Sequence, residues 1–247
     1  MLCQAMSHDP QKERRLAMTN IVILTGAGIS AESGLGTFRD AQGLWAQHRI
    51  EDVATPEGFA RDPALVHDFY NTRRAEAAKA RPNAAHQALA RLENLYSGEV
   101  LIITQNVDGL HEAAGSRNVL HMHGQLDGAL CHACDHRWPA PPMMRPEDAC
   151  PACGGQATRP DVVWFGEIPY HMDRIDPALN TADIFAAIGT SGNVFPAAAY
   201  GQHARRMGAH TVEFNTQISA ASRDFAEHHR GPASFTVAQW VDELLCG

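Results

Sequence analysis

Lysine is almost absent from this sequence. Only Lys12 and Lys79 occur in 247 residues, and arginine supplies the other 18 of the 20 basic residues, against 28 acidic ones. A formal net charge of -8 without a polybasic run argues against a protein that binds nucleic acid or membrane surfaces, because such proteins concentrate positive charge on one face. We therefore expect neither nucleic acid nor membrane among its partners.

Long apolar runs are also missing. No stretch approaches the roughly 18 to 20 consecutive apolar residues that a membrane-spanning helix needs. Residues 1–18 lack the apolar segment of a secretory signal and are predicted to form a flexible N-terminal tail. The remainder, 19–247, has an ordinary globular composition, and we expect it to be a cytoplasmic protein.

Short β-branched runs alternate with polar loops and helical patterns. The runs occupy residues 21–25, 100–104, 184–188 and 210–214. This alternation predicts an α/β fold, Rossmann-like, in which a parallel sheet carries helices on both faces. Because ligands bind at the carboxyl ends of the strands in such sheets, the loops that follow these runs are expected to converge on one crevice.

The segment between the first two predicted strands is too long for a single crossover helix. It therefore predicts an inserted helical module at about residues 41–99. One helix in it is well marked, since Asp62 is suited to the N-cap, Pro63 to the first helical position, and Pro82 to ending the run.

Four of the six cysteines form two close pairs. Cys131 and Cys134, then Cys150 and Cys153, are separated by fifteen residues, which is typical of a tetrahedral four-thiolate zinc site. A module at about residues 125–160 has little apolar periodicity, so metal binding would replace the missing core. With all four positions filled by protein, the zinc would be structural. Disulfides are disfavoured without an export signal, and His132 and His136 are expected to stay outside the ligand set.

A glycine-rich loop follows the first predicted strand. Residues 26–30 offer backbone N–H groups to a phosphate. The motif alone is weak and is compatible with an ordinary strand-to-helix turn. Ala31 occupies the place of the third glycine of the dinucleotide fingerprint, which disfavours hydride transfer, and the P-loop lysine is absent.

Several further segments occur in the order typical of one family. They are residues 26–30 with 36–39, 104–108, 121–124, the four cysteines, 163–167 and 189–191. Together they resemble the sirtuins, NAD-dependent protein-lysine deacylases, over about residues 19–245. The resemblance implies NAD as co-substrate, one structural zinc, and acylated lysine side chains of proteins, bound as an extended peptide, as partners.

The resemblance implies that His123 is the general base that activates a ribose hydroxyl of NAD. Histidine suits this role because its ordinary pKa of about 6.5 lets it accept a proton near neutrality. His121, two residues earlier, would point to the same side of a strand, so spacing alone does not choose between the two. The motif chooses His123.

The cofactor contacts also come from the resemblance. Asn106 and Asp108 would pair with the nicotinamide carboxamide, Gln105 with a ribose, and Phe38 and Arg39 would close over the cofactor. The full expected set is Gly26, Ala27, Gly28, Ile29, Phe38, Arg39, Trp45, Gln105, Asn106, Val107, Asp108, Gly189, Thr190, Ser191, Asn215, Thr216, Gln217 and Ala233.

The acyl preference is predicted from the marked helix. Tyr70 and Arg73 are three residues apart and share one helix face, where a phenol and a guanidinium can bind a terminal carboxylate. By spacing, Arg74 could serve as well. The pair resembles the class III sirtuins, which remove succinyl and malonyl as well as acetyl groups. Peptide contacts are implied at Val163, Trp164, Phe165 and Gly166.

One segment departs from the family pattern. Gly36 and Thr37 stand where the family often has proline and aspartate, which is expected to loosen the loop.

Two other functions stay open at this stage. One is mono-ADP-ribosyl transfer on the same scaffold, and the other is a zinc-ribbon nucleic-acid module, which the acidic balance disfavours.

Overall fold

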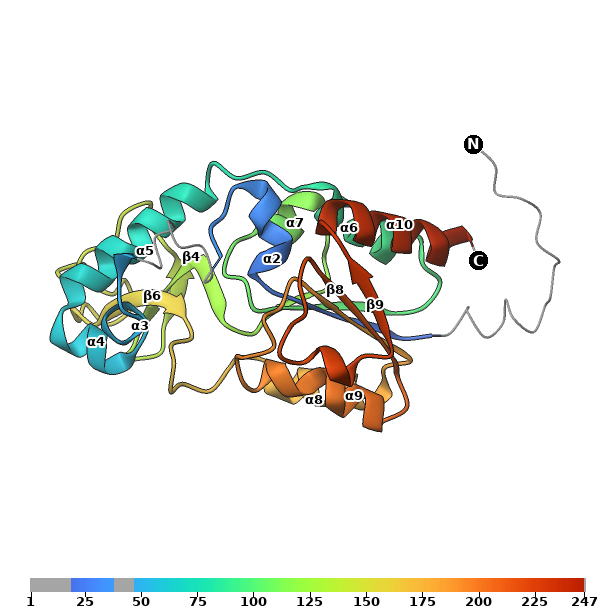
Figure 1. Ribbon diagram of the computed structural model, residues 1–247. Helices are drawn as coiled ribbons and strands as arrows, with labels where there is room; N and C mark the ends of the chain where they lie inside the picture. Colours follow the sequence, from blue (N-terminus) through green and yellow to red (C-terminus); the bar gives the residue numbers. More distant parts are fainter. Residues whose placement is uncertain (1–18, 38–46, 247) are drawn as a thin grey trace.

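The computed structural model describes residues 19–37 and 47–246, and these form a larger and a smaller lobe (Figure 1). The larger lobe contains a six-stranded, fully parallel sheet, so the predicted fold class is confirmed. In spatial order its strands are β3 (Val119–His121), β2 (Val100–Thr104), β1 (Ile21–Thr25), β7 (Ile184–Ile188), β8 (His210–Asn215) and β9 (Glu227–Arg230).

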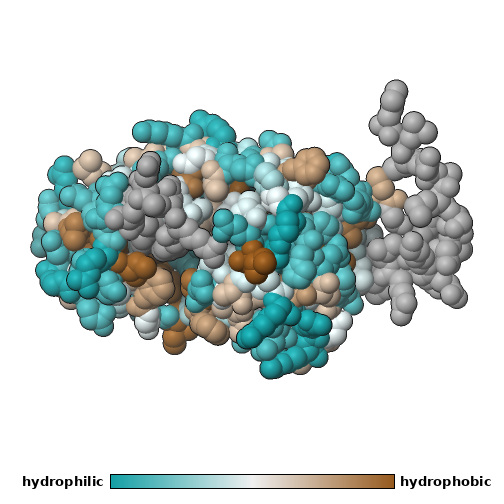
Figure 2. Space-filling model, in the orientation of Figure 1, coloured by the Kyte–Doolittle hydropathy of each residue, from teal (hydrophilic) through white to brown (hydrophobic). Residues whose placement is uncertain are grey.

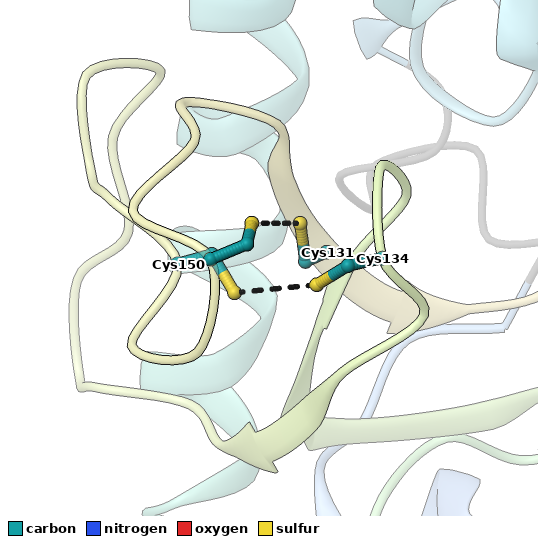
Figure 3. A group of neighbouring side chains, drawn as sticks. Cys131, Cys134 and Cys150 are labelled. Carbon is teal, nitrogen blue, oxygen red and sulfur yellow. Dashed lines mark hydrogen bonds between the residues drawn. The ribbon is translucent and has the colours of Figure 1, made fainter.

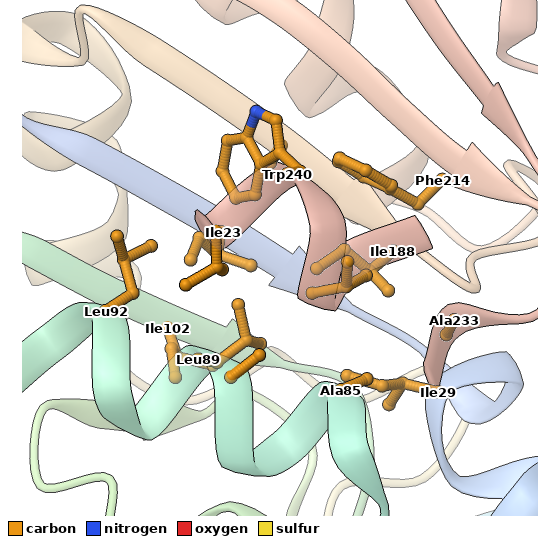
Figure 4. Packing of buried hydrophobic residues seen from close by; sticks show 14 of the residues in the cluster. Ile23, Ile29, Ala85, Leu89, Leu92, Ile102, Ile188, Phe214, Ala233 and Trp240 are labelled. Carbon is orange, nitrogen blue, oxygen red and sulfur yellow. The ribbon is translucent and has the colours of Figure 1, made fainter. Parts of the chain in front are cut away.

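Helices cover both faces of this sheet because side chains alternate along its buried strands. Ile21 and Ile23 of β1 face a core cluster with α6 (Ala84–Leu95) and α10 (Ala233–Cys246), shown in Figure 4. Val22 and Leu24 face the opposite cluster, with α8 (Met172–Thr181) and α9 (Tyr200–Arg206). The large sheet is therefore stabilised by apolar burial on both sides.

The smaller lobe combines helices with a second sheet. Its helices are α3 (Ile50–Val53), α4 (Pro56–Arg61) and α5 (Pro63–Ala77), and its antiparallel sheet has the order β5 (Arg137–Pro139), β4 (Gly124–Cys131) and β6 (Thr158–Val162). Both predicted insertions are thus present. Although α6 lies within the helical module expected at about 41–99, it packs on the large sheet.

The marked helix begins as its sequence predicts. The Asp62 carboxylate accepts a hydrogen bond from the Leu65 N–H at 3.0 Å, and Pro63 occupies the first turn. The helix ends at Ala77, before Pro82. The next helix, α6, has its own cap at Asn83, whose side chain accepts from the Ala85 N–H at 3.0 Å.

The two sheets meet at a two-residue connection. β3 of the large sheet ends at His121, and β4 of the small sheet begins at Gly124. Gly124 has a φ of +76°, and a Cβ there would lie 2.1 Å from the carbonyl oxygen of Asp161. Only glycine fits this junction, and His123 is placed directly before it.

Shorter helices line the crevice side of the large lobe. They are α2 (Ala27–Ser30), which continues as a 3-10 turn to Ser33, and α7 (Leu110–Ala114). Across residues 19–37 and 47–246, no helix is both long enough and apolar enough to cross a membrane. The predicted tail, 1–18, lies outside the described residues.

Candidate active site

The loops at the carboxyl ends of four strands converge, as expected for this fold. The N–H of Gly26 donates to the Ile188 carbonyl at 3.0 Å, and that of Gly28 donates to the Gly189 carbonyl at 2.9 Å. A Cβ at Gly28 would lie 2.7 Å from the Cα of Gly189, so the two loops require glycine at their contact. The N–H of Gly189 donates in turn to Phe214 at the end of β8.

The same crevice continues toward the expected adenosine side. A small cavity there is lined by residues that include Leu24, Gln105, Thr190 and Gly192. The Asn215 amide donates to the Thr190 carbonyl at 2.7 Å, which ties the β7 and β8 loops together.

Three further residues were expected to contact the adenosine part of NAD. Thr216 and Gln217 are exposed. Ala233 is buried at the start of α10, in the same core cluster as Ile29 (Figure 4).

The loop after β2 forms a buried polar pocket against α2. The Asn106 amide nitrogen lies 3.2 Å from both the Gly26 carbonyl and the Ser30 hydroxyl, and the Ser30 hydroxyl donates to Asp108 at 3.1 Å. Asp108 also accepts from the Leu110 N–H at 3.1 Å. Burial raises the pKa of the Asp108 carboxyl, against the opposing effect of these hydrogen bonds.

His123 faces the first residue of this loop. Its Nδ1 lies 3.2 Å from the Gln105 carbonyl oxygen, and a carbonyl can only accept, so Nδ1 carries the hydrogen. In the neutral ring Nε2 is therefore the acceptor. Burial lowers the pKa of His123, which favours this neutral form at pH 7.

His121, the alternative left open by spacing, is engaged at both ring nitrogens. Nδ1 lies 3.1 Å from the Asn106 carbonyl, and Nε2 lies 2.8 Å from the Glu112 carboxylate. Although burial opposes it, these partners raise the pKa of His121 above its ordinary value. The geometry thus favours His123 as the base and gives His121 a structural position under the loop.

The pair expected to bind an acyl carboxylate lies on α5. Tyr70 is 1% exposed, and the Arg73 guanidinium carbon lies 5.7 Å from its ring centroid. Burial lowers the pKa of Arg73, and the neighbouring Tyr70 and Asp108 oppose this shift.

Arg74, the alternative to Arg73, is used elsewhere. It donates to the Leu126 carbonyl at 2.6 Å and to the Asn71 amide oxygen at 2.9 Å. The Arg74 guanidinium therefore connects α5 to the small sheet.

The four cysteines lie together in the small lobe (Figure 3). The Sγ atoms of Cys131 and Cys153 are 3.7 Å apart, those of Cys134 and Cys150 are 3.8 Å apart, and all four lie within 4.8 Å of one another. A tetrahedral zinc with Zn–S bonds of about 2.3 Å requires sulfurs about 3.8 Å apart. The residues therefore fit a structural zinc.

Matching turns shape the two halves of this site. Asp135 follows one cysteine pair and Gly154 the other, and both have left-handed backbone with φ of 58° and 72°. Each N–H donates to the carbonyl of the first cysteine in its pair, at 2.8 and 2.9 Å. His132 and His136 are not part of the group, and the His136 ring stacks on Trp138.

The expected peptide segment, 163–166, follows β6 and is not itself a strand. Its first three N–H groups are used within the chain: Val163 donates to His123, Trp164 to the Glu167 carboxylate, and Phe165 to Ala54. Phe165 is 43% exposed. The face seen in Figure 2 carries several small, separate hydrophobic patches among hydrophilic residues.

Two contributors to the site were missed by the sequence analysis. Ser30 joins Asn106 to Asp108, and Glu112 holds His121. The hydroxyl in the loop at 26–30 was a signal for the first, whereas Glu112 is distant in sequence from its partner. Phe38, Arg39 and Trp45 lie outside the described residues.

A parallel sheet with converging polar loops, a neutral histidine beside them and a four-thiolate module defines a zinc-containing α/β enzyme of the nucleotide-binding class. The chain belongs to the Sir2 family, whose model matches residues 26–196.

Comparisons with individual proteins agree with this assignment. The chain is 54% identical over 229 residues to an NAD-dependent protein deacylase of Caulobacter vibrioides, covering 91% of this chain and 96% of the relative. An NAD-dependent protein deacylase of Salmonella typhimurium is 53% identical over 232 residues, with 92% and 84% covered.

Solved structures agree as well. A Sir2 homologue in complex with NAD superimposes with a TM-score of 0.85 at 38% identity, covering 96% of this chain and 94% of the other. A mutant Sir2 homologue with ADP-ribose gives a TM-score of 0.87 at 38% identity, with 96% of both chains covered.

Proposed function

We propose that this enzyme removes acyl groups from lysine side chains of proteins at the expense of NAD, releasing nicotinamide and O-acyl-ADP-ribose. Relatives at 53 to 54% identity carry the name NAD-dependent protein deacylase, which supports this activity over mono-ADP-ribosyl transfer. The observation that carries the proposal is His123 at the junction of the two sheets, with Nδ1 on the Gln105 carbonyl and Nε2 left as the proton acceptor.

NAD, when bound, supplies a ribose carbon with nicotinamide as its leaving group. The part of His123 is to accept a proton from a ribose hydroxyl at Nε2. Its lowered pKa keeps the ring neutral, and the Gln105 carbonyl fixes the tautomer and the ring orientation.

The nicotinamide end is assigned to Asn106 and Asp108. Because the Asn106 amide N–H groups are directed at Gly26 and Ser30, its oxygen is the atom left to a ligand. The Asp108 carboxylate is a second acceptor. Two buried acceptors suit the NH₂ of a carboxamide. Ile29, the expected apolar neighbour of the ring, is 0% exposed and packs in the core cluster behind this loop.

The acyl group is assigned to Tyr70 and Arg73. Arg73 is partly buried, and a partly buried cation gains more from a carboxylate than a fully exposed one does. Succinyl and malonyl lysine present such a carboxylate, whereas acetyl lysine does not. The proposed enzyme therefore accepts all three groups and favours the acidic ones.

The peptide is proposed to bind in extended form along residues 163–166. Since the N–H groups of the first three residues are used internally, the peptide would be recognised through carbonyl oxygens of this segment. Recognition through main-chain atoms tolerates varied sequences. We further propose a cytoplasmic location, since a four-thiolate metal site requires reduced cysteines.

Matched acetyl and succinyl peptides incubated with NAD and the metal-loaded enzyme test the proposal. Mass spectrometry is expected to detect free lysine, nicotinamide and O-acyl-ADP-ribose. Loss of neither acyl group would refute deacylation. ADP-ribose that stays on protein, followed with adenine-labelled NAD, would instead favour mono-ADP-ribosyl transfer.

A further inference from the structure

A contact between two aromatic side chains links the small sheet to the acyl pocket. Trp164 is 3% exposed, and its Nε1 lies 3.0 Å from the hydroxyl oxygen of Tyr70. An indole nitrogen can only donate, so the Tyr70 oxygen is the acceptor. The hydrogen of the phenol therefore cannot point at Trp164 and is left for another acceptor.

A buried ion pair holds this indole in place. The Arg159 guanidinium carbon lies 3.4 Å from the Trp164 ring centroid, and its two terminal nitrogens bind Glu167 at 2.6 and 2.9 Å. Glu167 also accepts from the Trp164 backbone N–H at 2.7 Å. Because Arg159 contacts the indole ring and Glu167 binds the backbone of the same residue, the ion pair restricts the orientation of the indole N–H.

Tyr70 lies beside the loop to which the nicotinamide end is assigned. Tyr70 and Trp164 share an apolar cluster with Val107, which stands between the two nicotinamide-pocket residues. Arg73 stacks over the Tyr70 ring. Burial raises the pKa of the Tyr70 phenol, so this group stays protonated and available as a donor at neutral pH.

We propose that Trp164 is a positioning residue that determines acyl specificity: its indole N–H orients the Tyr70 hydroxyl so that this hydroxyl donates to the terminal carboxylate of a succinyl or malonyl lysine. This inference rests on the proposed function. An acetyl group has no carboxylate to receive the hydrogen bond, so its removal depends less on the orientation of Tyr70.

A double-mutant cycle of Trp164→Phe and Tyr70→Phe tests the inference, with kcat and KM measured on succinyl and acetyl peptides. Trp164→Phe keeps an aromatic ring but removes the donor. It is expected to raise KM for the succinyl peptide about three- to tenfold, the range for one hydrogen bond, and to lower the succinyl-to-acetyl ratio of kcat/KM. In the Tyr70→Phe background it is expected to have no further effect on that ratio.

Trp138→Phe is the matched control, since Trp138 stacks on His136 in the small sheet, and it is expected to leave the ratio unchanged. Should Trp164→Phe fail to fold, Arg159→Met releases the indole without removing it and is expected to lower the ratio in the same way. An unchanged ratio in the folded variant, or an equal effect with and without the Tyr70 hydroxyl, overturns the inference while deacylation stands. A wild-type enzyme that removes neither acyl group overturns the proposed function itself.

Discussion

The two lobes achieve order by different means. In the large lobe, side chains from both faces of a parallel sheet are buried against helices, in two clusters made of aliphatic and aromatic residues (Figure 4). The small lobe has one apolar cluster, in which Leu126 and Val162 of its sheet pack with residues of α5, and its long loop is held by polar contacts, such as the Met144 N–H to Asn71 at 2.9 Å, and by the four thiolates. The large lobe is therefore stabilised by apolar burial on two faces, whereas the small lobe combines one apolar cluster with a metal site, and the histidine proposed as the base lies where they join.

The largest expected effect comes from removing that histidine, because it disables chemistry without disturbing either lobe. His123→Ala is expected to lower kcat for nicotinamide release about 100-fold or more, as for loss of a general base, with an unchanged Tm. His203→Ala is the control, since His203 is half-buried on α9, outside the site, and contacts Asn180. Retained turnover in His123→Ala would reassign the base.

Removing the metal is expected to affect the two lobes differently. Dialysis against a chelator is expected to lower activity more than about tenfold and to abolish hydrogen-exchange protection in β4 to β6, while β1, β2 and β7 stay protected, because only the small sheet depends on zinc for its order. Cys134→Ser should reproduce the effect, whereas Cys246→Ser, outside the cluster, should not. Simultaneous loss of protection in both lobes would show that they unfold as one unit.

A smaller and more selective effect on activity is expected from changing Arg73 on α5. Arg73→Met is expected to lower kcat/KM for a succinyl peptide about 10- to 100-fold, the range for a charged hydrogen bond, and to affect an acetyl peptide far less. Arg81→Met serves as control, since Arg81 donates to the carbonyls of Ala78 and Ala80 just after the same helix. Equal losses on both peptides would reject Tyr70 and Arg73 as the carboxylate pocket.

The sequence predicted the large lobe better than the small one, for a physical reason. Residues 21–25, 100–104 and 184–188 are buried on both faces and form continuous apolar runs, which are easy to recognise. β3, with three residues, and β9, with a polar sequence of alternating burial, carry no such pattern and were missed. The small sheet was predicted only through its cysteines.

The site residues were predicted from sequence order and family resemblance, as for Asn106, His123 and Arg73, and their roles stay predictions. Spacing alone did not separate Arg73 from Arg74. The structure adds that Arg74 binds the Leu126 carbonyl, a partner far away in the sequence. Glu112 beneath His121 is likewise visible only in three dimensions.

The mildest prediction concerns pH and the large lobe alone. His86 and His111 are both 0% exposed, with ring centroids 5.0 Å apart, and His111 bonds Thr25 of β1. Burial lowers their pKa values to about 4 and about 3, from an ordinary 6.5. Below pH 6.5 these two histidines therefore become protonated in the unfolded chain but stay neutral in the folded protein. The stability from these two groups is complete above pH 6.5 and declines as pH falls toward 4.

Thermal unfolding of the metal-loaded protein at pH 7, 6 and 5 is expected to show this decline as a Tm loss on the order of 5 °C. His111→Gln lowers the Tm at pH 7 by disturbing the core, but it also removes one of the two titrating groups, so its Tm should depend less steeply on pH. His203→Gln, on α9 and outside the core clusters, should keep the wild-type slope. If His111→Gln also keeps the wild-type dependence of Tm on pH, the buried histidines are not the cause. The loss of stability in acid would then be assigned to the zinc thiolates of the small lobe.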